Sequence, residues 1–385
     1  MQNKATMKFA ILSIALFLMS HTSIAPALPS LLKLYKGIDP NIGMADVQQL
    51  IAITGSTIAI GLLLSNLFIA KLGKKNTVLI GLSFIFLSGV LSFTNYDNYQ
   101  TVFYSRLILG IGLGLFNSIS ISIISDYYEG VDRAKMIGFR MVFLNIGKFI
   151  TTLIAGYTLY IGAQYTFLVY LLVLPVMVMF YFWVDNTADV TKAAPAKSVV
   201  IVNRDAILLA IITLLIGIAY IGATNTIPFL LENKFGYSKA FSSNLLSFLG
   251  LSGIVIGALF GKFTKIVGYR AILIMSTLMG ISLLGFTLGN NVVIFYVSSF
   301  LAATAFTGNM SGVFYYISRT FKQEQINFVT SFALVFGQIG GVLTPIVLTR
   351  FPQAMKWDVF TTPFYIASAF MLINILCYSL LKNRD

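Results

Sequence analysis

Residues 206–231 read AILLAIITLLIGIAYIGATNTIPFLL, a stretch of 26 residues that contains no charged side chain. The hydrocarbon core of a bilayer is about 30 Å thick, so a helix needs about 20 apolar residues to cross it. This stretch is therefore predicted to be a membrane span. Working outward from it, the polar breaks in the chain define eleven more such stretches. All twelve lie at 9–32, 47–70, 77–94, 101–125, 137–160, 164–184, 206–231, 240–261, 271–288, 292–317, 327–349 and 362–381.

The composition also indicates a membrane protein. Of the 385 residues, 57% are apolar and only 10% are charged, whereas about 25% of the residues in a soluble domain are charged. We therefore exclude a soluble enzyme. One cysteine, Cys377, and one histidine, His21, exclude a disulfide framework and a cysteine or polyhistidine metal site, so no metal or other cofactor is expected. The sequence contains no G-x-x-x-x-G-K-[ST] loop, so direct coupling to ATP is not expected.

The distribution of Lys and Arg predicts the orientation of the chain. If the N-terminus is cytoplasmic, the inner segments carry 18 basic residues and the outer segments carry 6, while Arg106 and Lys148 lie inside spans. We therefore expect a multi-pass protein of the cell membrane with both termini cytoplasmic. The net charge of +13 follows from this bias, so nucleic acid is not an expected partner. Lys4 and Lys8 before the first apolar run would also suit a cleaved signal peptide, but eleven further spans favour a membrane helix.

A polar stretch divides the predicted spans into two sets of six. Residues 185–205 form the longest polar segment inside the chain and follow the sixth span. Such a segment is typical of a linker between two helical bundles. We therefore predict an N-terminal six-helix bundle over 1–184, a cytoplasmic linker over 185–205 and a C-terminal six-helix bundle over 206–385.

The two halves share short patterns at a common spacing. The tripeptide Gly73–Lys75 follows the second span, Gly268–Arg270 follows the eighth, and the two glycines are 195 positions apart. Gly55 and Gly250 have the same spacing. This agreement predicts an internal six-helix repeat, and duplicated halves with a cavity between them are typical of secondary transporters.

Polar side chains are concentrated in some of the spans. Such groups are costly in hydrocarbon unless they are paired or hydrated, so the spans that carry them are expected to line a cavity. These side chains are Arg106, Asn117, Asn145, Lys148, Asn225, Asn309 and Gln338. The sixth span, 164–184, has almost nothing to hydrogen-bond and is predicted to face lipid. The distribution favours a pore or carrier over a passive anchor.

The loop after the second span is rich in lysine. Residues 66–75 read NLFIAKLGKK, so Gly73, Lys74 and Lys75 lie just beyond the helix. The lysines could form part of a gate between the two conformations of a carrier. Alternatively they only fix the topology.

An arginine and three glycines share the fourth span. Arg106 lies about five residues inside it, or about 7 Å below the outer surface at 1.5 Å per residue. Gly110, Gly112 and Gly114 allow a neighbouring helix to approach closely. A fixed cation at this depth can lower the pKa of a nearby carboxylate or hold an anionic group. The alternative is an arginine that extends to the outer interface.

Two prolines lie near the end of the first span. Pro26 and Pro29 free backbone carbonyls and bend the helix, which suits a gate, although they could simply mark a helix end. Together these patterns resemble the major facilitator superfamily over essentially the whole chain. The loop is similar to its G-x-x-x-D-R-x-G-R-K sequence, the fourth span to R-x-x-x-G-x-G, and the first span to the P-x-x-P of twelve-span drug/proton antiporters. The resemblance implies an all-α membrane protein with twelve transmembrane helices in two pseudo-symmetric six-helix bundles, the major facilitator fold.

The sequence also departs from the family pattern. Asn66 and Ala70 replace the glycine and the acid of the loop, so a gating ion pair built on that acid is not expected. The fifth span lacks the proline of the antiporter pattern G-x-x-x-G-P-x-x-G-G and carries Lys148, about 17 Å from the inner end of its helix. Asn145 and Thr152 share its face. A lysine at this depth is predicted to be functional, with pairing for packing as the alternative.

A carboxylate deep in the membrane is missing, although proton-coupled carriers commonly use one. His21 is the only side chain in a predicted membrane interior whose unperturbed pKa lies near neutrality, so it is a candidate for proton transfer, or a packing residue. Asp46, at the outer start of the second span, is the other candidate and lies at a predicted depth similar to that of Arg106.

Two functions remain open. The first is a proton-coupled exporter of small amphipathic organic compounds or drugs, in which Asn117, Asn225 and Asn309 orient the substrate and the two bundles rock against each other. The second is a carrier for an organic anion or metabolite, in which Arg106 and Lys148 bind negative charge. A receptor or scaffold would need a soluble signalling segment, and none is predicted. The expected partners are a small-molecule substrate, protons and the lipid bilayer, and we expect a monomer without enzymatic activity.

Overall fold

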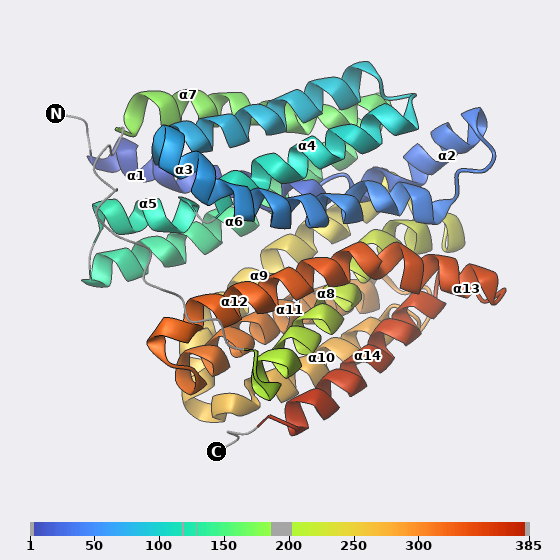
Figure 1. The fold of residues 1–385 in the computed structure, drawn as a ribbon. Helices are drawn as coiled ribbons and strands as arrows, with labels where there is room; N and C mark the ends of the chain where they lie inside the picture. Colours follow the sequence, from blue (N-terminus) through green and yellow to red (C-terminus); the bar gives the residue numbers. More distant parts are fainter. Residues whose placement is uncertain (1–3, 118, 129, 186–201, 382–385) are drawn as a thin grey trace. The chain divides into compact units, whose positions relative to one another are not determined.

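Helices form all the regular secondary structure in the described part of the chain. The computed structural model describes residues 4–117, 119–128, 130–185 and 202–381 (Figure 1). The α-helices are α1 (Lys4–Ser13), α2 (Leu28–Ile38), α3 (Met44–Thr94), α4 (Tyr99–Asn117), α5 (Ile119–Tyr127), α6 (Gly130–Thr158), α7 (Val173–Trp183), α8 (Arg204–Phe229), α9 (Lys239–Val267), α10 (Ala271–Gly285), α11 (Val292–Thr320), α12 (Gln323–Pro345), α13 (Phe351–Ala354) and α14 (Thr362–Ser379). The 3₁₀ segments are η1 (Ile14–Phe17), η2 (Ser20–Thr22), η3 (Ala25–Ala27), η4 (Ala163–Leu172) and η7 (Gly268–Arg270), and the π turns are η6 (Leu230–Lys234) and η8 (Ile346–Arg350).

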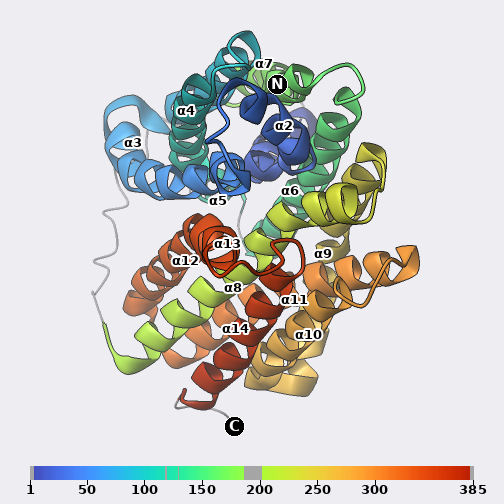
Figure 2. The same ribbon diagram turned by 90° about the vertical axis from the view of Figure 1, so that its right-hand side faces the viewer.

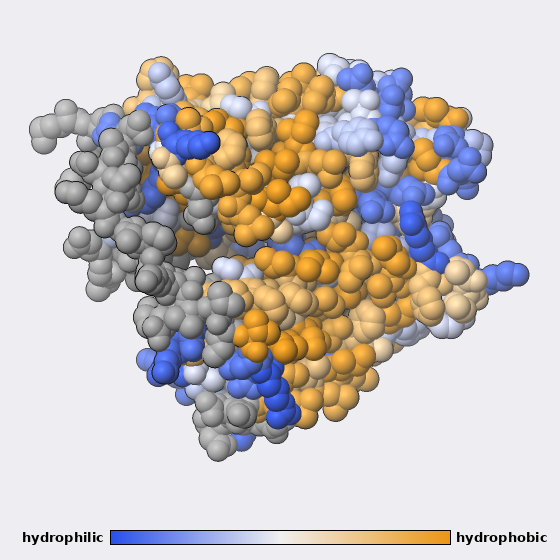
Figure 3. All heavy atoms as spheres, in the orientation of Figure 1, coloured by the Kyte–Doolittle hydropathy of each residue, from blue (hydrophilic) through white to orange (hydrophobic). Residues whose placement is uncertain are grey.

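Eleven helical stretches in the described residues are long and apolar enough to cross a membrane. The longest, Lys239–Gly285, has 47 residues and covers the predicted span 240–261 and most of the predicted span 271–288. At 1.5 Å per residue this is about twice the thickness of a bilayer, and a glycine with a φ of 55° separates α9 from α10 within it. The prediction of an all-α, multi-pass membrane protein is confirmed, while the number twelve stays a prediction. Figure 3 shows mostly apolar atoms along the visible flanks of the helices and hydrophilic atoms near their ends.

Contacts divide the chain into two compact units. The first comprises Met1–Lys192 and Lys239–Ser247, and the second comprises Ala193–Ser238 and Phe248–Asp385. Residues 186–201 of the predicted linker lie outside the described residues. The predicted boundaries at 184 and 206 therefore stay a prediction.

In the first unit, α4 packs against both halves of the long helix α3 (Figure 1). Helix α3 bends at Gly73, whose φ of 77° lies in the left-handed region that glycine enters without strain. The bend separates the predicted second and third spans, which fold back on each other. Both can therefore contact a single neighbouring helix.

The first membrane span is interrupted in its middle. Helix α1 gives way to η1, η2 and η3, and α2 then continues to Ile38. Pro26 and Pro29 lack the N–H groups that an α-helix would donate to the carbonyls four residues earlier. The sequence predicts a bent helix that ends near residue 32. The structure instead has a 3₁₀ centre and a longer outer helix. The outer helix is longer because the chain after the second proline has no helix-breaking residue until Gly37.

In the second unit, α8 packs against α12 and α14, and α10 packs against α11 and α14 (Figure 2). Glycines bring α8 and α12 together, since a Cβ on Gly217 would lie 2.2 Å from the carbonyl oxygen of Gly337. An apolar cluster at one end of this unit includes Ile212, Ile216, Val313, Tyr316, Ile317 and Tyr378.

Candidate functional site

Arg106 is a fully buried cation in α4. Its Nη1 donates to the hydroxyl of Tyr170 at 2.7 Å, and its Nη2 reaches Ser92 Oγ at 3.5 Å. The rings of Phe167 and Tyr170 lie 5.1 Å and 4.9 Å from the guanidinium carbon, within the range of cation–π attraction. Among the described residues, no carboxylate contacts Arg106, and its Nε has no hydrogen-bond partner. Hydroxyls and aromatic faces thus surround a charge that is costly to bury without a counter-charge.

Tyr170 joins Arg106 to the interrupted centre of the first span. Its hydroxyl accepts from the guanidinium and donates to the backbone oxygen of Ser20 at 3.1 Å. Tyr170 lies in η4 and is fully buried, whereas Phe182, farther along the same predicted span, is 65% exposed. The prediction that the sixth span faces lipid is therefore wrong for Tyr170. A buried phenol needs hydrogen-bond partners, and it finds them on two other spans.

His21 lies next to Ser20 in η2. Its side chain is 5% exposed, and its Nδ1 has no hydrogen-bond partner. The hydroxyl of Ser20 is also buried without a partner. Tyr170 links Arg106 to the backbone of the adjacent Ser20, and Lys148 lies on α6, which packs against η1 and η2. The structure therefore gathers three of the predicted charge-site residues around one interrupted segment.

Helix α6 holds Lys148 against this segment. Lys148 is 4% exposed. Helix α6 approaches the first span so closely that a Cβ on Gly147 would lie 1.9 Å from the carbonyl oxygen of Leu16. One turn further, Thr151 Oγ1 accepts a hydrogen bond from Ser23 Oγ at 2.6 Å. These contacts fix the depth of the lysine relative to the 3₁₀ centre of the first span.

The glycines of the fourth span let α4 touch both halves of α3. Gly110 and Gly114 face the first half, where a Cβ on Gly114 would lie 2.3 Å from the carbonyl oxygen of Ile58. Gly112 faces the second half, where a Cβ would lie 2.6 Å from the carbonyl oxygen of Gly81. No larger residue fits at these positions without moving backbone. The glycines therefore hold the buried arginine of α4 at a fixed place in the first unit.

Acidic side chains occur only near the ends of the described spans. Within the eleven spans they are Asp46, Asp205 and Glu232, each within three residues of a span end. Asp46 caps α3 by accepting from the backbone N–H of Gly43 at 2.8 Å, and it lines a cavity of about 670 Å³ beside the loop that joins α2 to α3. It is not among the contacts of Arg106. In the described residues, no group of three or more His, Cys, Asp or Glu is arranged to hold a metal ion.

Two of the predicted cavity amides bind other groups of the first unit. Asn117 Oδ1 accepts from Arg140 Nη2 at 3.1 Å, and Arg140 Nε donates to Ser120 Oγ at 2.7 Å. Asn145 donates to the backbone oxygen of Met141 at 2.9 Å, within its own helix. Asn117 therefore serves as a partner for a buried arginine in this conformation.

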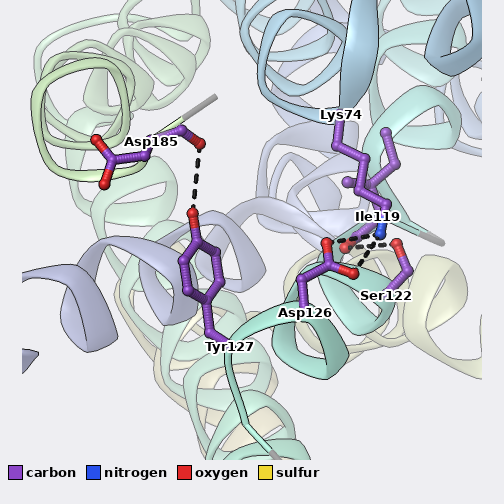
Figure 4. Close-up of polar contacts among 6 residues, drawn as sticks. All are labelled: Lys74, Ile119, Ser122, Asp126, Tyr127 and Asp185. Carbon is purple, nitrogen blue, oxygen red and sulfur yellow. Dashed lines mark hydrogen bonds and ion pairs between the residues drawn. The ribbon is translucent and has the colours of Figure 1, made fainter. Parts of the chain in front are cut away.

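An ion pair connects the loop that follows the second span to α5. Lys74 is buried, and its Nζ lies 2.8 Å and 2.6 Å from the two carboxylate oxygens of Asp126 at the end of α5 (Figure 4). The next lysine, Lys75, lies over the ring of Tyr181, 5.2 Å from its centroid. The loop lacks the family's own acid, but Lys74 pairs with a carboxylate at the end of α5, just beyond the fourth span.

Tyr127 follows Asp126 and contacts the end of the sixth span. Its hydroxyl donates to the backbone oxygen of Asp185 at 3.3 Å (Figure 4). Partial burial, together with the negative charges of Asp185 and Asp126, raises the pKa of Tyr127. The phenol therefore stays protonated, and keeps its hydrogen bond, above the usual pKa of a tyrosine.

The predicted polar residues of the second unit have different surroundings. Both amide atoms of Asn225 in α8 are buried without hydrogen-bond partners, as is Oε1 of Gln338 in α12. Asn309 in α11 is engaged, since its Oδ1 accepts from Ser276 Oγ at 3.0 Å and Asn374 donates to the same hydroxyl at 3.2 Å. Asn225 is therefore the polar side chain of this unit that most needs a partner from outside its own helix.

A second ion pair lies where α8 ends. Lys234 in η6 binds Asp358, which also accepts from the backbone N–H of Phe360 at 2.9 Å and from the hydroxyl of Thr361 at 2.7 Å. Partial burial opposes ionisation of this carboxyl, but the hydrogen bonds from Lys234, Thr361 and Phe360 hold its pKa below the usual value. Asp358 thus ties η6 to the start of α14.

The loop that mirrors Gly73–Lys75 in the second unit has a similar backbone but different contacts. Gly268 has a φ of 55°, and no atom lies within 4 Å of the position of a Cβ there. Arg270 ends η7 and is exposed. A glycine with a positive φ is therefore common to both loops.

Sequence reasoning missed several residues that complete these sites. Tyr170, Asp126 and Asn374 are partners of predicted residues, and Arg140 is buried although its position near a span end suggests only a topological role. For Tyr170 and Asn374 the available signal was a phenol or amide in an otherwise apolar span, which predicts a hydrogen-bond partner without naming it.

Comparison with known proteins agrees with this arrangement. The sequence pattern of the Major Facilitator Superfamily matches residues 10–345. The chain belongs to the Major Facilitator Superfamily. It is thus a membrane transporter rather than an enzyme, and the resemblance predicted from its short motifs is confirmed.

Individual relatives are distant. A probable vesicular acetylcholine transporter-B of Danio rerio is 28% identical over 162 residues, which are 40% of this chain and 32% of the relative. A probable vesicular acetylcholine transporter-A of the same species is 33% identical over 86 residues, or 22% of this chain and 17% of that one. The chain therefore matches a third or less of the length of these relatives.

Two solved structures share the fold across nearly their whole length. The human organic anion transporter MFSD10 (TETRAN) has a TM-score of 0.70 at 16% identity, with 97% of this chain and 98% of that chain covered. A D-xylose–proton symporter has a TM-score of 0.76 at 14% identity, with 99% and 98% covered. At these identities the likeness shows the fold alone.

Proposed function

We propose that this major facilitator protein carries a small organic anion, with Arg106 and Lys148 supplying the positive charge that attracts it. The observation that carries the proposal is the charge balance of the first unit. Two buried cations and His21 surround the interrupted centre of the first span, while every acidic residue in the described spans lies near a span end.

The electrostatic argument concerns the cost of buried charge. A cation in a low-dielectric interior is expensive unless a counter-charge or water accompanies it. Arg106 is surrounded by hydroxyls and rings, with one nitrogen unpartnered. An anionic substrate would provide the missing counter-charge, so its binding energy would come partly from relieving this cost. A cationic substrate would add to it.

Transport would proceed by alternating access, driven by an ion gradient. The predicted linker 185–205 would allow the predicted bundles 1–184 and 206–385 to rock around the substrate. A bound anion would offset the positive charge of a proton on His21, so the open Nδ1 of His21 makes it our candidate for a proton that moves together with the anion. Asp46 is the alternative. Asn225 and Gln338 are candidates for hydrogen bonds to the substrate. We propose a monomer in the cell membrane with cytoplasmic termini.

A proton-coupled exporter of amphipathic compounds or drugs is the second candidate. The R-x-x-x-G-x-G pattern of the fourth span and its tight packing favour this function, because that pattern is typical of proton-coupled members. The names of the Danio rerio relatives, which specify acetylcholine, add a cationic amine to the substrates worth testing. The buried cations Arg106 and Lys148 argue against this exporter function, because they would repel a cationic substrate.

Substitution of Lys148 tests the proposal. In proteoliposomes, Lys148→Gln should raise the KM for a transported anion such as naphthoate about tenfold or more, because one charge-assisted contact contributes about 1.5–3 kcal/mol. Lys148→Arg should keep most of the affinity. Lys322→Gln removes an exposed lysine at the start of α12 and serves as the matched control, with KM unchanged. An equal KM for wild type and Lys148→Gln, or transport of cations alone, would contradict the anion proposal.

A further inference from the structure

Tyr170 connects three membrane spans through one hydroxyl group. It accepts a hydrogen bond from Arg106 Nη1 at 2.7 Å and donates one to the backbone oxygen of Ser20 at 3.1 Å. The direction of both bonds is fixed, because a guanidinium can only donate and a carbonyl can only accept. The phenol therefore donates its single proton to the first span, and its oxygen accepts a hydrogen bond from the fourth span.

Both ends of the Tyr170–Ser20 bond lie in 3₁₀ segments. Ser20 belongs to η2, in the middle of the interrupted first span, and Tyr170 belongs to η4, a 3₁₀ segment of 10 residues. Long 3₁₀ stretches are uncommon, and within a span they often mark a hinge. Arg106, in contrast, lies in a continuous α-helix held by close glycine contacts. The bridge therefore ties a rigid charged site to two deformable segments.

The ring and the hydroxyl of Tyr170 act on Arg106 separately. The ring lies 4.9 Å from the guanidinium carbon, and Phe167 offers a second ring at 5.1 Å. A Phe at position 170 would preserve the aromatic contact and remove only the two hydrogen bonds. Substitution can therefore isolate the connection to the first span.

We propose that Tyr170 is a positioning residue that transmits the state of Arg106 to the backbone of the first span. This assignment rests on the proposed function. It means that an anion binding near Arg106 and the movement of residues 14–27 occur in the same step. An anion that draws the guanidinium toward itself also draws the phenol, and the phenol holds the carbonyl of Ser20. Tyr170 itself does not touch the substrate.

Kinetics of Tyr170→Phe test the assignment. In proteoliposomes with naphthoate as the probe, kcat should fall about tenfold while the equilibrium Kd, measured on detergent-solubilised protein, changes by less than about threefold. Tyr316→Phe is the matched control. Tyr316 is another fully buried tyrosine, whose hydroxyl lies 3.5 Å from Asp205 in the second unit, and its loss should leave kcat unchanged. A kcat at the wild-type level in Tyr170→Phe, or an equal fall in both variants, would overturn the assignment.

Hydrogen exchange without any substrate separates this proposal from the proposed function. Backbone amides of residues 14–27 should exchange faster in Tyr170→Phe than in wild type, and at the wild-type rate in Tyr316→Phe. If naphthoate fails to bind wild type but this difference is present, the anion proposal fails and the positioning role stands. Unchanged exchange in Tyr170→Phe refutes the positioning role. Should Tyr170→Phe not fold, Arg106→Lys, which lacks the planar fork, should accelerate exchange in the same segment.

Discussion

Gly114→Ala should destabilise the first unit by forcing α4 away from α3. The new Cβ would lie 2.3 Å from the carbonyl oxygen of Ile58, 2.7 Å from Gly61 Cα and 2.8 Å from the nitrogen of Leu62. Ordinary contacts begin near 3.4 Å, so the two helices must separate by about 1 Å. All three neighbours are backbone atoms and cannot turn aside. Overpacking of this kind costs about 1–3 kcal/mol.

The matched control for this experiment is Gly261→Ala in α9, where no atom lies within 4 Å of the new Cβ. Both substitutions gain about 1 kcal/mol of helix propensity, so the difference between the two variants isolates the clash. Thermal unfolding in detergent should place Tm of Gly114→Ala several degrees below that of Gly261→Ala, at about 2–4 °C per kcal/mol. Equal Tm values would refute the packing argument.

Further predictions concern the two ion pairs. Lys74→Gln should lower stability by about 1–2 kcal/mol, because Asp126 loses its partner while retaining some solvent, whereas Lys75→Gln should leave Tm nearly unchanged; equal shifts would contradict the pairing. The lowered pKa of Asp358 means that folding favours its ionised form. The stabilisation by Lys234 is therefore present above the pKa of an unfolded aspartate, about 3.9, and is lost as the pH falls below that value. Between about pH 5 and 3 the Tm of wild type should therefore fall more than that of Asp358→Asn, and parallel curves would show that the pair contributes nothing.

The membrane class and the family were predictable because they depend on local sequence. The length and composition of the stretch 206–231 are enough to predict a membrane span. Gly110, Gly112 and Gly114 predict close helix packing because they carry no side chain. Residues two apart on a helix face nearly opposite sides. Periodicity therefore predicts that the middle glycine meets a different neighbour. It does not say that both neighbours are halves of one bent helix.

The partners of the charged residues could not be predicted from one sequence. Tyr170 is 64 positions from Arg106 and 150 from Ser20, and Asp126 is 52 positions from Lys74. Apolar spans look alike whether they face lipid or protein, since both surroundings are apolar. Contacts across the bundle depend on how each helix is rotated, and a single sequence does not encode that rotation in an obvious pattern.

The conformation of the first span was only partly predictable. Pro26 and Pro29 indicate freed carbonyls. The 3₁₀ conformation already begins at Ile14, twelve positions before the first of these prolines, so the prolines do not account for all of it. Close contact with α6, where Gly147 meets Leu16, supplies a tertiary constraint that the local sequence does not reveal.

Transport by the wild-type protein of two naphthalene probes of similar size and opposite charge tests the central claim most directly. Liposomes that contain the protein and a pH-sensitive dye would receive either naphthoate or naphthylmethylammonium, with uptake and proton movement followed together. Our account predicts saturable uptake of naphthoate and none of the amine, whether or not protons move. Uptake of the amine with outward proton exchange, and no uptake of naphthoate, would contradict it and establish the exporter function instead.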